Sequence, residues 1–152
     1  MLSLQYIRQV LPGQLEGVSD SQIIESAAGY DGIVALVQTK GLPTAVVLEH
    51  NDVGEFSFRP GGFLKASQSL WVMRMVGRDA DRRAVQDECA ALMKRILSVF
   101  AARGDDAQLA GWEWNSVPYG IRNAGPNYTG YEFTMNFSED IDLSYDGQTE
   151  TR

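Results

Sequence analysis

Apolar residues recur at helical spacing most clearly between residues 79 and 103. The charged residues of this segment lie mainly away from the apolar stripe, as in an amphipathic helix. Asp79 or Asp81 can accept hydrogen bonds from the unpaired N–H groups at its start, and Gly104 suits a left-handed stop. The pattern predicts one long helix that packs on the fold through Val85, Cys89, Leu92, Ile96 and Phe100.

The first forty residues predict shorter elements. Apolar residues within Leu2–Leu11 repeat at helical spacing, and Pro12-Gly13 ends this first helix. A second helix is expected to begin near Ser19-Asp20-Ser21, which offers N-cap side chains, and to run to Gly29. The apolar run Gly32–Gln38 is short and begins at a glycine, so it predicts a strand.

Period-two alternation and β-branched residues predict strands in the rest of the chain. These strands are Thr44–His50, Glu55–Phe58, Gln68–Val76, Gln108–Val117 and Gly130–Ser138. Turn-forming residues predict a turn at Asn51–Gly54, a break at Arg59–Gly62 and a loop over Tyr119–Asn127. Both faces of Gln68–Val76 are mostly apolar, so a helix or another subunit must cover its second face.

These elements predict an α+β fold in which the long helix packs on one face of an antiparallel or mixed sheet, with short N-terminal helices. A length of 152 residues suits one domain. We assign residues 1–138 to this single α+β domain. Residues 139–152 are acidic and polar, and we expect them to form a C-terminal arm.

Charge restricts the classes of partner. The formal net charge is −7 and the pI about 4.6, which argues against direct nucleic-acid recognition, because such binding depends on Lys and Arg. The densest basic patch comprises Arg74, Arg78, Arg82 and Arg83, and Asp79 and Asp81 interrupt it. We interpret it as a mixed, solvated surface. No apolar run approaches 18 residues, so we expect no membrane partner.

The residue types needed for catalysis or metal binding are scarce. His50 is the only histidine, and we expect it to be a dispensable, exposed residue where a strand ends. Cys89 is the only cysteine and is expected to be a buried structural thiol. No phosphate-binding glycine motif occurs, and the acidic run Ser138–Asp142 followed by Asp146-Gly147 lacks calcium-loop spacing. We therefore expect no cofactor and no enzymatic activity.

Aromatic residues lie mostly in the predicted β elements. Core packing is the simplest interpretation, and part of the set is expected to cover a subunit contact. Two alternatives stay open. One is a small-ligand or peptide-binding module whose aromatic pocket would bring Trp112, Trp114 and His50 together. The other is an enzyme of a type that no motif identifies.

The order of elements resembles the tail-terminator and tail-completion proteins of tailed phages and prophages over about two thirds of the chain. The elements that carry the resemblance are the helix Leu2–Leu11, the strand Gln68–Val76, the helix Asp79–Arg103 and the closing strands Gln108–Val117 and Gly130–Ser138. Phe58-Arg59-Pro60 followed by Gln68-Ser69-Leu70-Trp71-Val72-Met73 is also similar to small prophage proteins.

The resemblance implies a structural subunit without a cofactor that forms a homo-oligomeric ring. Its other partners would be tail or neck proteins, and it would reside in the virion after assembly in the bacterial cytoplasm. Rings need contacts between different faces of adjacent subunits, and a spare sheet edge, a loop at Arg59–Lys65 and the C-terminal arm would provide them. The expected interface residues are Arg59, Phe63, Lys65, Trp112, Trp114, Tyr128, Asp140, Asp142 and Tyr145.

Overall fold

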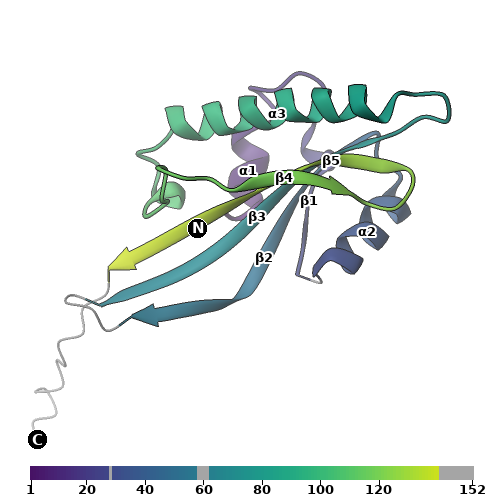
Figure 1. The fold of residues 1–152 in the computed structure, drawn as a ribbon. Helices are drawn as coiled ribbons and strands as arrows, with labels where there is room; N and C mark the ends of the chain where they lie inside the picture. Colours follow the sequence, from purple (N-terminus) through teal and green to yellow (C-terminus); the bar gives the residue numbers. More distant parts are fainter. Residues whose placement is uncertain (28, 58–61, 141–152) are drawn as a thin grey trace, which may run out of the picture.

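The computed structural model describes residues 1–27, 29–57 and 62–140, and within this part of the chain it has an α+β fold. Five strands form one mixed sheet in the order β1-β2-β3-β5-β4 (Figure 1). The helices are α1 (Leu4–Val10), η1 (Asp20–Gln22), α2 (Gly29–Lys40), α3 (Arg82–Ala102) and η2 (Ala107–Leu109). The strands are β1 (Ile23–Ser26), β2 (Thr44–Ser57), β3 (Phe63–Met75), β4 (Tyr119–Asn123) and β5 (Tyr128–Asp140).

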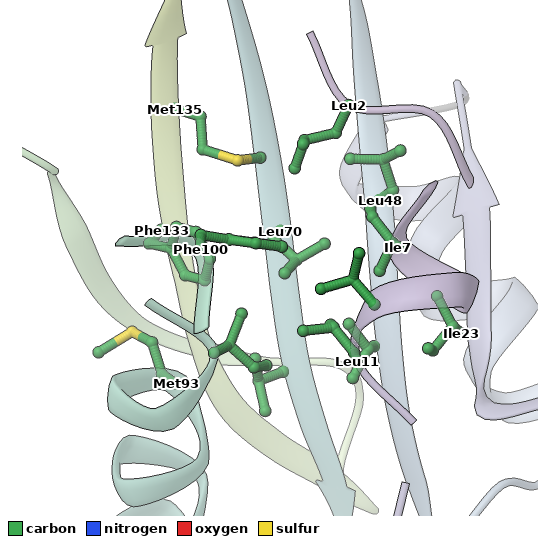
Figure 2. Packing of buried hydrophobic residues seen from close by; sticks show 14 of the residues in the cluster. Leu2, Ile7, Leu11, Ile23, Leu48, Leu70, Met93, Phe100, Phe133 and Met135 are labelled. Carbon is green, nitrogen blue, oxygen red and sulfur yellow. The ribbon is translucent and has the colours of Figure 1, made fainter. Parts of the chain in front are cut away.

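Strand β3 is the centre of the sheet, and helices cover both of its faces. Leu70 and Val72 belong to a buried cluster shared with α1 and α3, shown in part in Figure 2. Trp71 and Met73 point to the opposite face and pack with α2, as side chains alternate along a strand. The prediction that both faces of this strand are covered is confirmed, and α2 of the same chain supplies the second cover.

The long helix is confirmed as α3, with a small shift of its buried stripe. Asp81 caps its start by accepting a hydrogen bond from the backbone N–H of Arg83. Leu92 and Val85 were predicted to be part of the stripe, but both are only half-buried. The fully packed residues of α3 are Gln86, Cys89, Met93, Ile96 and Phe100.

Two N-terminal predictions were wrong. The segment Gly32–Gln38 is not a strand but lies inside α2, in which Ile33 and Val37 stand one turn apart and are both buried. The second helix expected from residue 19 is only the short η1. Ile23 instead begins β1, because it pairs in parallel with Val46 of β2. This parallel pair joined through α2 makes the sheet mixed.

The C-terminal half also differs from expectation. The predicted strand Gln108–Val117 is η2 followed by irregular chain, in which Trp112 alone makes a bridge to Phe137. The predicted loop Tyr119–Asn127 contains β4, which pairs with β5. The turn expected at Asn51–Gly54 is instead a register shift between His50 and Gly54 within the continuous β2.

Strand β5 is longer than predicted. It runs from Tyr128 to Asp140, and its last residues Glu139 and Asp140 pair with Leu64 and Phe63 of β3. The first two residues assigned to the C-terminal arm therefore belong to the sheet. Residues 141–152 lie outside the described part of the chain.

Candidate protein-contact groove

Strands β2, β3 and β5 continue together past the ends of the helices, which leaves one end of the sheet projecting (Figure 1). In this projecting end Leu64 pairs with Phe56 of β2 and with Glu139 of β5. Leu64 lies on the same face as Leu70, because alternate residues of a strand share a face. That face is the one that α1 and α3 cover further along the sheet.

A groove of about 770 Å³ lies at this end of the sheet. Its floor includes Phe56, Leu64 and Phe137, and Met1 and Gly111 are among the residues that wall it. Met1, Phe56 and Leu64 have exposed fractions of 45%, 41% and 43%, which are large for apolar side chains that sit together. A cluster of exposed apolar residues on a protein surface often marks a site of contact with another molecule.

The end of the groove carries four exposed charged residues, Glu55, Lys65, Glu139 and Asp140. Glu139 pairs with Leu64 and shares its face, whereas Glu55, Lys65 and Asp140 alternate to the opposite face of the sheet. Burial lowers the pKa of the Met1 amino group, and the negative charge of Glu139 opposes that shift. The groove therefore combines an apolar floor with one carboxylate that interacts with the N-terminal amino group.

The wall formed by Gly111 is held against the edge of β5. The backbone N–H of Ser138 donates to the carbonyl of Gly111 at 2.8 Å, and Glu113 N–H donates to Asn136 at 2.8 Å. Gly111 has a φ of +81°, and a Cβ at this position would overlap the carbonyl oxygen of Ser138. Trp112 follows, and its buried ring contacts Phe100 and Phe137.

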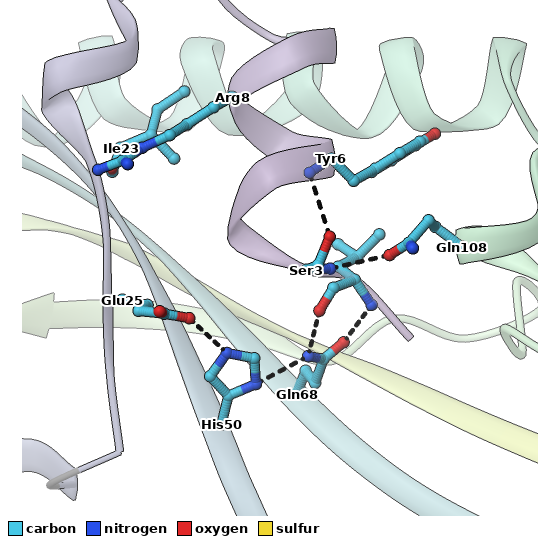
Figure 3. A network of polar contacts seen from close by, with 9 residues as sticks. Ser3, Tyr6, Arg8, Ile23, Glu25, His50, Gln68 and Gln108 are labelled. Atoms are coloured by element: carbon cyan, nitrogen blue, oxygen red, sulfur yellow. Dashed lines mark hydrogen bonds and ion pairs between the residues drawn. The ribbon is translucent and has the colours of Figure 1, made fainter.

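The wall formed by Met1 is anchored through Gln68, whose exposed fraction is 1% (Figure 3). Leu2 N–H donates to Gln68 Oε1 at 2.7 Å, and Gln68 Nε2 donates to the carbonyl of Leu2 at 2.8 Å. Gln68 Nε2 also lies 3.1 Å from His50 Nδ1, and His50 Nε2 lies 2.9 Å from Glu25. With Nδ1 as the acceptor, the imidazole carries its proton on Nε2 and donates to the carboxylate.

His50 is therefore not the exposed strand-end residue that the sequence predicted. It lies inside β2 and is half-buried, because β2 continues through the expected turn. Its two ring nitrogens are both engaged in a network that fixes the first residues of the chain. This arrangement gives His50 a positioning role in the fold.

Of the predicted interface residues, Lys65 and Asp140 lie at the end of the groove, with their side chains on the face of the sheet opposite to Leu64. Phe63 begins β3 beside them and is half-buried, on the face opposite to Leu64. Arg59, Asp142 and Tyr145 lie outside the described residues.

Two of the three aromatic residues predicted to lie at an interface belong to the buried core of the single chain. Tyr128 is buried, and its hydroxyl donates to the carbonyl of Leu42 at 2.8 Å. Trp112 is also buried, since β5 and α3 pack on it. Trp114 alone is exposed, with its ring stacked on Trp112 at a centroid distance of 3.9 Å. Neither tryptophan lines the groove, and nor does His50, so the aromatic pocket required by the ligand-binding alternative is not formed there.

Sequence reasoning missed the apolar residues of the groove. The alternation over Glu55–Phe58 was visible, but the face that receives Phe56 depends on the register shift between His50 and Gly54. Leu64 was hidden inside a predicted loop. The residues around Ala107 and Gly111 come from a segment far along the chain, and only the packing against β5 brings them near.

The described residues offer little reactive chemistry. Burial raises the pKa of the Cys89 thiol to about 12, so it stays protonated and poorly nucleophilic. No group of three or more His, Cys, Asp or Glu in the described ranges is placed to hold a metal ion. In the same ranges, no helix is long and apolar enough to cross a membrane. Comparisons with protein-family models and with curated proteins find no significant match.

Proposed function

We propose that this protein is a structural subunit of a phage or prophage tail or neck assembly, of the tail-terminator or connector type. It acts through protein contacts in an oligomeric ring and resides in the virion, without catalysis. The observation that carries the proposal is the apolar groove at the projecting end of the sheet, next to the residue where β5 ends. Of the elements that prompted the resemblance, the first helix, β3, α3 and β5 support it, whereas Gln108–Val117 is not a strand.

A ring needs two different surfaces on each subunit, because head-to-tail contacts join one face to another. The groove is one such surface. The edge strand β4 offers a second, since Tyr119, Ile121 and the nearby Trp114 are all exposed there. None of these three residues lines the groove, so both surfaces can be occupied at once.

Mass in solution tests the proposal. We expect light scattering coupled to size exclusion to give a multiple of the 16.8 kDa chain, alone or mixed with a phage tail-tube protein, and electron microscopy to show rings. A Leu64→Glu variant should need at least tenfold more protein to assemble, because the charge would be desolvated without a partner.

The matched control is Ala84→Glu, which adds the same single negative charge at an exposed position of α3. It should assemble like the parent, and both variants should keep the parent's unfolding midpoint. A parent chain that stays monomeric at high concentration, both alone and with a phage tail-tube protein, would contradict the proposed function.

A further inference from the structure

The segment that follows β5 has a composition that suits the groove. Residues 141–146 have the sequence Ile-Asp-Leu-Ser-Tyr-Asp, in which apolar and polar residues alternate. In an extended chain alternate side chains share a face, so Ile141, Leu143 and Tyr145 would form one apolar row. The polar residues between them would face water. The row would meet an apolar floor made by Phe56 of β2, Leu64 of β3 and Phe137 of β5, which share one face of the sheet.

Distance permits the segment to reach another molecule. It begins at Asp140, on the rim of the groove, and the twelve residues 141–152 can span at most about 40 Å when extended. Five residues of such a chain cover roughly 17 Å. The groove volume of about 770 Å³ lies within the roughly 300–1,000 Å³ typical of binding sites, enough for a short run of side chains.

The order of residues favours the groove of a neighbour over the groove of the same chain. To fill its own groove, the chain would have to reverse directly after Asp140. The dipeptide in this segment that favours a turn is Asp146-Gly147, which comes after the apolar row. A return after that turn would place only Gln148–Arg152, all polar, over the apolar floor.

We infer that residues 141–145 of one copy of this chain lie in the groove of the next copy and so link adjacent subunits of the ring. This inference rests on the proposed function, since it requires that copies assemble. In this contact the groove of one copy is the acceptor, and the C-terminal segment of the adjacent copy is the element that is exchanged.

Disulfide trapping between full-length chains tests the inference. The native Cys89 is buried and does not compete for the oxidant. A Leu64→Cys variant is mixed with a Leu143→Cys variant that carries a mass tag, under conditions in which light scattering shows the assembled species. We expect the mixed dimer to form at least tenfold faster than with Lys94→Cys as the partner.

The outcomes separate the two proposals. Assembly without preferential trapping at Leu64 would overturn the docking of the segment and leave the proposed function standing. Absence of any assembled species would overturn both. A chain that carries Leu64→Cys and Leu143→Cys together adds a further check, because an intrachain disulfide formed at a rate independent of protein concentration would show that the segment occupies its own groove.

Discussion

Single residues explain how the start of the chain becomes part of the core. Gln68 is a polar residue at the centre of β3, yet both polar atoms of its side chain are hydrogen-bonded, to Leu2 and His50. A buried amide is tolerated only when it is paired in this way, since an unpaired buried group is costly. The Gln68 side chain therefore bonds the backbone N–H and C=O of Leu2, as a neighbouring strand would do, and so holds Met1 beside the groove.

Replacement of Gln68 tests this role. We expect Gln68→Leu to lower the free energy of unfolding by about 1–3 kcal/mol for each Leu2 group that loses its partner. His50→Gln should cost less, because His50 is about one third exposed and water can replace its bonds. Urea unfolding of both variants measures the difference. A larger loss for His50→Gln than for Gln68→Leu would reverse the assignment.

At the scale of elements, the helices and strands with a long apolar pattern were predicted more accurately than those with a short one. The helix α3 and the inner parts of the strands β3 and β5 were predicted correctly because each repeats its period over several turns or several residue pairs, whereas the outer end of each strand was missed. The short β1 and β4 were missed, since their strand state comes from pairing with β2 and β5. Residue propensities give a weak signal over four or five residues, so tertiary contacts decide whether such a short segment forms a strand. The groove was beyond prediction for the same reason.

The one-residue shift of the α3 stripe has a measurable effect. Met93 has an exposed fraction of 3% and packs against the sheet, whereas Leu92 is half-buried at the flank. We expect Met93→Ala to cost about 2–5 kcal/mol of unfolding free energy, as for other large-to-small core changes. Leu92→Ala, the matched change one position away, should cost less than half as much. Equal losses in thermal or urea unfolding would contradict the observed orientation of the helix.

At the scale of the whole molecule, one polar cluster connects α1 to the C-terminal end of α3. The Tyr6 hydroxyl of α1 donates to Asp106 at 2.6 Å, and Arg103 at the end of α3 lies 2.8 Å from the same carboxylate. These two partners, Tyr6 first, lower the pKa of Asp106 below its usual value of 3.8. The cluster thus joins α1 to the chain that leads into η2 and the wall of the groove.

The sign of this shift gives a prediction in acid. A carboxyl whose pKa is lower in the folded state contributes stability above pH 3.8, and that contribution is lost as pH falls through the folded value. Asp106→Asn should therefore flatten the loss of stability below about pH 4. Asp105→Asn, at the exposed neighbouring position, serves as the control and should retain the parent's slope. Identical acid unfolding curves for the parent and Asp106→Asn would contradict the cluster's role.

Because one end of the sheet projects past the helices, we expect the outer part of β3 to open more often than its inner part. Its inner residues Leu70–Met73 are buried on both sides, whereas Leu64 and Lys65 are exposed on opposite faces of the same strand. Backbone amides of the inner part should exchange with deuterium only when the whole domain unfolds, and those of the outer part through local fraying. Exchange mapping of the dilute and the assembled protein would show where a neighbour protects the chain. Slow, uniform exchange along all of β3 in the dilute protein would contradict this division.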